Sequence, residues 1–570
     1  MLCPAFYTFV FNCYSTSARL FVIGGIELRS EEGTTQGDPS AMATYALALV
    51  PLMNILHQIE NAALEVAFAD DITGAGSLEK LLTWWMQLLE SGPKYGYFPK
   101  SSKSYLIVKE EHYERAQQMF AGTGINVTSA GKRHLGAVIG SQAYKQEFVN
   151  SIVDKWIREL RVLTEIAETQ PQAAYSAYIH GFKHKFTYTM RTIPTICNEM
   201  KRVEAVVRNE FIPAVTGGHA CSDEERKLLS LPVKFGGLGI HEVDKRSNQE
   251  YEASRKVTQQ LVDNIKTQTN DAADDVAEQS RLKKEVKKER KDRMQRDLET
   301  IISTMSAKEK RQNEIVIGST SNWLTSLPLE EFNFNLNKME FWDAIRLRYN
   351  WPIPNLPNRC ACGEKFNVNH AMSCKKGGFV TQRHNELRDV TGKFLKEVCA
   401  DVEIEPPLIR LTGEQMRHKT AKKQDDARPD ISARDFWIKG QKTFLDVRVF
   451  DPNAMTYQHL TMKQCYQKHE NEKKRHYNER ILNVDQGSFS PLVFSVTGGI
   501  ATEAKVFYSR LAGMIAMKRK VEKSIVQSFL NTTLNFALIR SMLMMLRGSR
   551  SLRKIDLTDE TIAEVTRRPN

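Results

Sequence analysis

The chain has 570 residues, more than the ~250–300 that one hydrophobic core supports, so we expect it to fold as several domains. Its net charge of +12 and pI near 9.1 indicate a polyanionic partner, for which nucleic acid is the natural candidate and a membrane surface the weaker one. The nine cysteines are scattered, which excludes a secreted disulfide framework, and no apolar run reaches the ~20 residues of a membrane span. A signal peptide would require a basic residue near its start, and none precedes Arg19. The sequence therefore predicts an intracellular, reducing compartment.

Residues 1–142 have the pattern of a small region of mixed helices and strands. Gly24 and Gly25 interrupt a run of strand-forming residues, which predicts a turn between two strands. Pro39 suits the first position of a helix, where its missing N–H costs nothing. In chain order the predicted elements are a hairpin over 17–28, a buried helix over 40–59, a strand that ends at Asp70-Asp71, an amphipathic helix over 78–91 and a turn over 133–136.

Two adjacent carboxylates, Asp70 and Asp71, stand at a predicted turn between two apolar runs. A two-metal phosphoryl-transfer site needs such carboxylates, because its divalent ions bridge the attacking and the leaving oxygens. An exposed acidic turn without any function would give the same dipeptide. The preceding motif, Thr34-Thr35-Gln36-Gly37-Asp38-Pro39, favours the catalytic interpretation.

The middle of the chain reads as helical. Residues 145–215 fit a thumb-like helical region or an ordinary helical bundle equally well, and Ser222 with Glu225 predicts a capping box. A glycine-rich turn and strand are predicted over 232–240, where the glycine spacing does not suit a phosphate-binding loop. Residues 281–296 hold nine basic and three acidic side chains, which indicates a solvated linker helix rather than a dedicated nucleic-acid-binding stripe.

A cluster of soft metal ligands follows the linker, with the spacing Cys360-x-Cys362-x7-His370-x3-Cys374. Three thiolates and an imidazole are a tetrahedral zinc set, and a closed set of four is structural. Unligated core cysteines are the alternative, which the matching histidine disfavours. Lys375 and Lys376 beside the cluster are predicted to contact phosphates. A helix is predicted over 381–399, with one apolar face.

A second acidic pair is predicted on two strands, 431–438 and 444–450, that are joined by a turn at Lys439-Gly440. Alternation puts Asp446 and Arg448 on one face of the second strand, and a hairpin would bring Asp430 close to Asp446. Two carboxylates on adjacent strands and a lysine are how restriction-type nucleases hold Mg²⁺ and activate water. The lysine normally stands two residues after the second acid, where this chain has Arg448, so Lys474 of the motif Lys474-x-x-Tyr477 is predicted in its place.

The order of these motifs resembles that of the non-LTR retrotransposon proteins that carry a restriction-like endonuclease at their C-terminus. The resemblance covers about residues 20–240 and 330–500. It implies a reverse transcriptase whose ancestor nicked a chromosomal target and primed RNA-directed DNA synthesis from the nick. The family's further catalytic Asp and its fingers have no counterpart before Asp38, so the chain resembles an enzyme that begins in the middle of its palm, and we expect little polymerase activity.

The resemblance also implies roles for individual residues. Those of the polymerase are Gln36 and Gly37 at the template, Lys103 near the incoming nucleotide, and Asp70 and Asp71 as ligands of Mg²⁺ or Mn²⁺. Those of the nuclease are Asp430, Asp446 and Lys474, and those of the zinc site are Cys360, Cys362, His370 and Cys374. Lys375, Lys376, Lys473 and Arg475 are predicted to position nucleic acid.

The predicted fold class is α+β. Its predicted parts are a partial palm over 1–142, a thumb-like region over 143–243, a charged helical linker over 244–325, a zinc-knuckle region over 326–380, a restriction-endonuclease-like α/β domain over 381–500 and a helical tail over 501–570. The predicted partners are an RNA template and a DNA target, not a membrane, and the predicted compartment is the nucleus. The rival hypothesis is a nucleic-acid-binding remnant that has lost catalysis.

Overall fold

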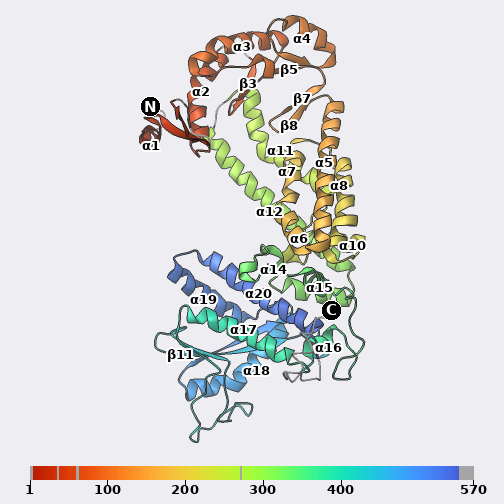
Figure 1. Ribbon diagram of the computed structural model, residues 1–570, viewed down its shortest axis with the longest axis vertical. Helices are drawn as coiled ribbons and strands as arrows, with labels where there is room; N and C mark the ends of the chain where they lie inside the picture. Colours follow the sequence, from red (N-terminus) through yellow and green to blue (C-terminus); the bar gives the residue numbers. More distant parts are fainter. Residues whose placement is uncertain (1–3, 32, 35–36, 59–62, 270–271, 551–570) are drawn as a thin grey trace, which may run out of the picture. The chain divides into compact units, whose positions relative to one another are not determined.

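The structure is a computed structural model that describes residues 4–31, 33–34, 37–58, 63–269 and 272–550 (Figure 1). It is a mixed α+β protein, about 59% helical, with small sheets. The chain divides into two compact units. Unit 1 comprises Met1–Ile152, Arg191–Pro194 and Glu250–Lys287, and unit 2 comprises Val153–Met190, Thr195–Gln249 and Lys288–Asn570.

Unit 1 is built from short helices and two-stranded sheets. β1 pairs with β2, β3 with β4 and β7 with β8 in antiparallel fashion, whereas β5 and β6 are parallel. The elements are α1 (Pro4–Tyr14), β1 (Ala18–Val22), β2 (Ile26–Ser30), α2 (Ala41–His57), β3 (Leu64–Phe68), β4 (Asp71–Ala75), α3 (Leu78–Ser91), β5 (Tyr105–Ile107), α4 (Tyr113–Met119), β6 (Asn126–Thr128), β7 (Gly131–His134) and β8 (Ala137–Gly140).

Several sequence predictions for unit 1 are confirmed and one is wrong. The hairpin turns at Gly24 and Gly25, both with positive φ, and α3 has the predicted bounds, with Ser77 accepting a hydrogen bond from the Lys80 N–H as its N-cap. The helix predicted to be buried, α2, buries only one face, because Leu49, Leu52 and Leu56 pack on Trp84, Trp85 and Leu88 while the rest is exposed or half-buried.

The first part of unit 2 is a set of helices. The capping box of Ser222 and Glu225 is present at the start of α10. The strand predicted within 232–240 is not formed, because the N–H groups of Leu238 and Ile240 both donate to the Leu229 carbonyl and hold the segment as a compact loop. The helices are α6 (Pro171–His180), α8 (Cys197–Val206), α9 (Ile212–Thr216) and α10 (Asp223–Ser230).

Four helices have residues in both units: α5 (Gln142–Thr169), α7 (Lys185–Thr192), α11 (Val243–Thr267) and α12 (Ala272–Thr304). The predicted linker over 244–325 is therefore helical, as expected, but it is not a part by itself. Its residues 250–287 belong to unit 1 and those from 288 onward to unit 2.

The C-terminal part of unit 2 contains a four-stranded sheet in the order β12-β11-β10-β9. β10 runs antiparallel to both neighbours, and β12 is parallel to β11. The strands are β9 (Ala400–Ile404), β10 (Ile431–Arg434), β11 (Lys442–Phe450) and β12 (Ser488–Ser495). The helices are α13 (Ala307–Ile317), α14 (Asn322–Thr325), α15 (Lys338–Tyr349), α16 (Val368–Ser373), α17 (Phe379–Lys396), α18 (Met462–Asn483), α19 (Thr502–Arg519) and α20 (Lys523–Arg547).

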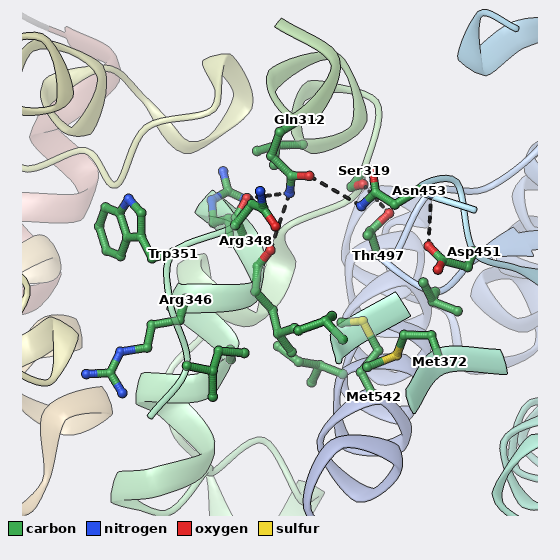
Figure 2. A pocket seen from close by; sticks show the side chains of 18 of the residues that line it. Gln312, Ser319, Arg346, Arg348, Trp351, Met372, Asp451, Asn453, Thr497 and Met542 are labelled. Carbon is green, nitrogen blue, oxygen red and sulfur yellow. Dashed lines mark hydrogen bonds between the residues drawn. The ribbon is translucent and has the colours of Figure 1, made fainter. Parts of the chain in front are cut away.

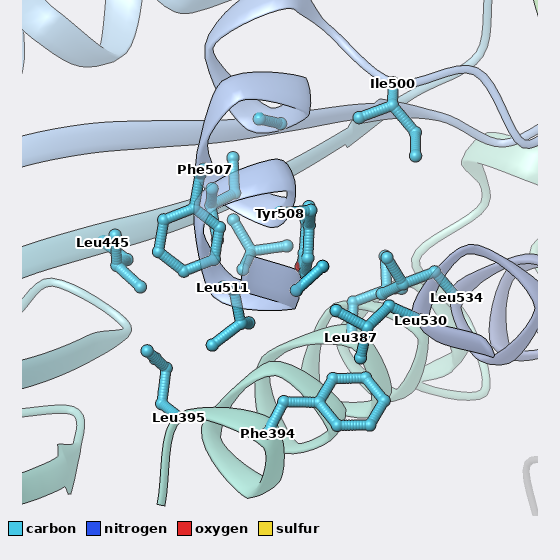
Figure 3. Close-up of a cluster of buried hydrophobic side chains, with 14 of the residues drawn as sticks. Leu387, Phe394, Leu395, Leu445, Ile500, Phe507, Tyr508, Leu511, Leu530 and Leu534 are labelled. Atoms are coloured by element: carbon cyan, nitrogen blue, oxygen red, sulfur yellow. The ribbon is translucent and has the colours of Figure 1, made fainter. Parts of the chain in front are cut away.

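Helices cover both faces of this sheet. Leu445 and Val447 of β11 point to one face, where α17, α19 and α20 supply a large apolar core (Figure 3). Phe444 and Phe450, on the alternate positions, pack against residues of α18 on the other face. The predicted apolar side of the helix over 381–399 is confirmed, since Leu387, Phe394 and Leu395 lie in the first core.

The segment predicted as a separate tail belongs to this core. Phe507 and Leu511 of α19 and Leu530 and Leu534 of α20 lie in the same cluster as Leu445 (Figure 3). The boundary predicted at residue 500 is therefore corrected for the described residues up to 550. One helix, Lys523–Arg547, is long and apolar enough to cross a membrane by length and composition, and 72% of its most apolar window is buried within the protein, as in the core helix of a soluble protein.

Candidate active site and metal centre

The two acids predicted for the nuclease lie close together, each next to a member of the first residue pair of β10 and β11, and the charge of Asp430 acts on Asp446. Ile431 pairs with Leu445, and the N–H of Asp430, the residue before β10, donates to the Leu445 carbonyl at 3.0 Å. One carboxylate oxygen of Asp430, Oδ2, accepts from the N–H of Val447 at 2.6 Å. The hairpin therefore brings the two carboxylates near each other, as the sequence predicted.

Asp446 is buried, with 3% of its surface exposed, and its neighbour is a lysine of α18. The Nζ of Lys473 lies 2.5 Å from Asp446 Oδ2. Burial raises the pKa of the Asp446 carboxyl to about 6 against the opposing charge of Lys473, and the charge of Asp430 adds to the rise. A buried carboxylate with a lysine and a second acid beside it is an arrangement typical of functional sites.

The lysine predicted from the sequence is corrected by the structure. Lys474 forms an ion pair with Glu503 of α19, whereas Lys473 makes the contact to Asp446. Successive helix residues point about 100° apart, so only one of two neighbouring lysines can face the sheet. Tyr477, one turn further along the same face, donates to the Arg428 carbonyl at 3.1 Å, and Arg475 is exposed.

A histidine completes this group, and the sequence analysis did not assign it a role. His384 of α17 places its Nε2 2.9 Å from Asp430 Oδ1. The apolar spacing in the sequence of α17 predicted only which face of the helix is buried. His384 lies on another face, and its contact with Asp430 depends on how the helix packs against the strands. Asp430 is thus held by two partners, His384 and the N–H of Val447.

The Cys and His residues predicted as a zinc set do come together. The ligand atoms of Cys360, Cys362, His370 and Cys374 all lie within 4.8 Å of one another, so this group could hold a metal ion such as zinc. The Sγ atoms of Cys360 and Cys374 are 3.7 Å apart, and Cys362 Sγ lies 3.3 Å from His370 Nε2. Both Cys360 and Cys374 are buried.

The backbone around the cluster suits thiolate ligands. Gly363, with φ of 94°, closes a tight turn in which its N–H donates to the Cys360 carbonyl at 2.9 Å. Although burial raises the pKa of the Cys360 thiol, hydrogen bonds from the Cys362 backbone and from His370 outweigh it and lower the pKa to about 6. Asn367 caps α16 by accepting from the His370 N–H at 2.9 Å, which fixes the helix that carries the histidine. Lys375 and Lys376 next to the cluster are exposed.

The residues predicted for a polymerase lie in unit 1. Asp70 and Asp71 stand at the turn between β3 and β4, and both are exposed. Ala69 before them has φ of 54°, and the Tyr97 hydroxyl donates to the Asp70 carbonyl at 3.0 Å. Gly37 has φ of 93° and the Lys103 side chain is exposed, while Gln36 lies outside the described residues.

A cavity in unit 2 lies apart from the acids. It is lined by residues of α13, α14, α15, α16 and α20 and by the loops after β11 and β12, and Figure 2 shows several of its polar members hydrogen-bonded to one another. Gln312 donates to the Arg348 carbonyl at 2.8 Å and accepts from Asn453 at 3.4 Å (Figure 2). We assign the cavity no chemistry.

Within the described ranges, only the Cys and His cluster brings three or more metal-binding side chains together. Asp430 and Asp446 are two carboxylates, a set that can hold a hard cation only with water or substrate oxygens as further ligands. A comparison with protein-family models finds none that matches the chain, and a comparison with curated proteins finds no similar protein.

Proposed function

We propose that this protein is a metal-dependent DNA endonuclease of the restriction-like type. The observation that carries the proposal is the grouping of Asp430 and Asp446 beside the Ile431–Leu445 pair of β10 and β11, with Lys473 on the second acid. Carboxylates on adjacent strands with a lysine beside them suit phosphodiester hydrolysis, because the reaction needs a held cation and a group that stabilises charge on the phosphate.

The donor set fits Mg²⁺ or Mn²⁺. Both ions prefer oxygen ligands, and Mg²⁺ is commonly held by one or two carboxylates plus substrate phosphate and water. Asp430 and Asp446 would hold the ion, which when bound polarises the phosphate and activates a water molecule. The other roles at the site are assigned to side chains of the protein.

Lys473 beside the buried Asp446 lowers the pKa of that carboxyl and so favours its ionised form. Its ammonium group would also donate to the negative charge that develops on the phosphate oxygens. His384 and the Val447 N–H orient Asp430, so that its carboxylate is fixed before the substrate arrives. Tyr477 holds α18 to the loop before β10.

The charged surroundings suit a DNA backbone. Lys375 and Lys376 beside the metal centre are exposed, and so is Arg475. We propose that a zinc ion held by the four-ligand cluster fixes this segment, and that its lysines contact phosphates. Lys473 is assigned to the catalytic step and not to general DNA binding.

We further propose that the chain derives from a non-LTR retrotransposon protein, with a reverse transcriptase palm in unit 1 and a chromosomal target, hence a nuclear location. The β3–β4 hairpin with Asp70 and Asp71 at its turn supports this ancestry. Primer extension on an RNA template by the purified protein, lost in Asp70→Ala, would support retained polymerase activity.

The rival function is DNA binding without cleavage, and one assay separates the two. The full-length protein is incubated with supercoiled plasmid in Mg²⁺, in Mn²⁺ and in EDTA, and DNA binding is measured in EDTA. A nuclease gives nicked circles in at least one metal and none in EDTA. Binding in EDTA without nicking in either metal would support the rival function, DNA binding without cleavage.

A further inference from the structure

Arg448 is an exposed residue on a strand that is otherwise well covered. It stands two residues after Asp446 on β11, the strand between β10 and β12. The neighbouring residues of this strand, Thr443 to Val447 and Phe450, are buried. Side chains two residues apart on a strand point to the same face, so Arg448 lies on the same side of the sheet as Asp446.

Two contacts of α18 bracket this position. Lys473 meets Asp446, and the ring of His469 packs on the ring of Phe450 with centroids 4.6 Å apart. His469 and Lys473 are four residues apart and lie on one face of α18. The helix therefore runs along the strand with Arg448 between its two contacts.

Some polar atoms around Arg448 make no hydrogen bond. Within the described part of the chain, Arg448 makes no hydrogen bond or ion pair that satisfies its guanidinium. His469 is 1% exposed, yet neither ring nitrogen has a hydrogen-bond partner, and Glu472 Oε2 is 3.7 Å from its Nδ1. Arg383 of α17, also buried, has an unbonded Nε and donates from Nη1 to the Met372 carbonyl.

Charges of both signs face these groups, and Lys473 among them is paired with Asp446. Burial and the charge of Arg448 lower the pKa of His469 to about 4, so its ring is neutral near pH 7 and keeps one N–H donor. Burial lowers the pKa of Arg383 to about 10, which leaves it charged. The charged groups around the cluster are Lys468, Glu472 and Lys473 on α18, Arg383 on α17 and Asp451 after β11.

We propose that the exposed Arg448 binds the DNA phosphate next to the one that is cleaved. The inference rests on the proposed nuclease function and adds a second phosphate subsite to it. Arginine suits this role because its planar guanidinium binds a phosphate through two parallel hydrogen bonds and stays charged at every relevant pH.

The spacing fits neighbouring phosphates. Two residues along a strand span about 6.5–7 Å. Successive phosphates of one DNA strand advance about 3.4 Å along the axis and also turn around it, so their separation exceeds that rise. A backbone with its cleaved phosphate at Asp446 and Lys473 would then present the next phosphate to Arg448.

The first test needs no cleavage. Binding of a 20-bp duplex is measured in EDTA over a range of salt concentrations for the full-length wild type and for Arg448→Ala, Arg448→Lys and Lys439→Ala. Lys439 is an exposed cation in the turn at the other end of the same hairpin and is the matched control. One lost phosphate contact lowers the slope of log affinity against log salt by about 0.9. We expect this loss for Arg448→Ala, with an unchanged slope for Arg448→Lys and Lys439→Ala.

The second test locates the contact. After the nick is mapped, a duplex is made with one uncharged methylphosphonate at the neighbouring phosphate. Wild type should bind and cut this duplex about tenfold less well than unmodified DNA. Arg448→Ala should bind and cut the two duplexes equally well. Equal sensitivity of both proteins, or a salt slope unchanged in Arg448→Ala, would overturn the subsite. A changed slope in a protein that never nicks would uphold the phosphate contact and reject only the nuclease.

Discussion

Lys473 places its Nζ 2.5 Å from Oδ2 of Asp446, while the next residue, Lys474, pairs with Glu503. The two lysines have the same chemistry and adjacent positions, so they form a matched pair of variants. We expect Lys473→Met to reduce plasmid nicking by about 10²–10³-fold, because it removes a donor aimed at developing charge. Lys474→Met should stay within about threefold of wild type, since it loses only a partly exposed ion pair. Equal losses in the two variants would count against the assignment.

The Cys and His cluster should hold one zinc ion per chain. Thiolate ligands bind metal as the segment folds, so Cys374→Ser should abolish bound zinc and lower the melting temperature. Cys399, a half-buried cysteine of the same unit, is the control, and Cys399→Ser should keep its zinc. Metal content is measured by mass spectrometry on the purified proteins. Zinc retained by Cys374→Ser would refute the ligand set.

The end of α20 should contribute strongly to the stability of unit 2. Arg547 donates to both carboxylate oxygens of Asp343, at 2.7 and 3.0 Å, and Asp343 is only 1% exposed. Arg547→Ala leaves a buried charge unpaired and should cost about 3–5 kcal/mol in urea unfolding. Adding Asp343→Asn should recover part of that loss.

An exposed pair gives the comparison for α20. Arg519 of α19 pairs with Glu397 at the surface, with 62% of its side chain exposed, so Arg519→Ala should cost no more than about 1 kcal/mol. Similar losses for Arg547→Ala and Arg519→Ala would mean that α20 is not anchored as described.

Stability should fall in acid partly through a buried histidine of unit 2. Burial, with Arg246 and Lys183 nearby, lowers the pKa of His241 to about 3, whereas the unfolded value is near 6.5. The unfolded chain therefore binds more protons between these values, and this contribution is complete above about pH 6.5 and is lost as the pH falls toward 3.

The slope of stability against pH in that window should be shallower in His241→Gln, by up to about 1.4 kcal/mol per pH unit. His459→Gln, an exposed histidine, is the control and should keep the wild-type slope. Unfolding by urea is followed at several pH values. An identical slope in all three proteins would contradict the assignment.

Local patterns in the sequence were sufficient for the parts of the fold that local interactions decide. The capping box of Ser222 and the bounds of α3 follow from residues within one turn. The proximity of Asp430 and Asp446 follows from one hairpin, in which Ile431 pairs with Leu445. These features need no knowledge of distant parts of the chain.

Features that depend on distant packing were not predictable in this way. α18 is polar around most of its surface, so its pattern does not show whether Lys473 or Lys474 faces the sheet. His384 meets Asp430 across forty-six positions of sequence, a contact set by how α17 lies on the sheet. α19 and α20 looked like a tail because their apolar partners, such as Leu387 and Leu445, come from earlier elements.

The nuclease site is tested most directly by the rate at which the full-length protein nicks supercoiled plasmid, measured for wild type, Asp430→Ala and Asp446→Ala, with DNA binding measured in EDTA for all three. The account predicts metal-dependent nicking by wild type, a loss of at least about 10²-fold in each variant, and binding that is unchanged or slightly stronger because a negative charge is removed. Nicking that persists in both variants, or a wild type that binds DNA and cuts it in neither Mg²⁺ nor Mn²⁺, would contradict it.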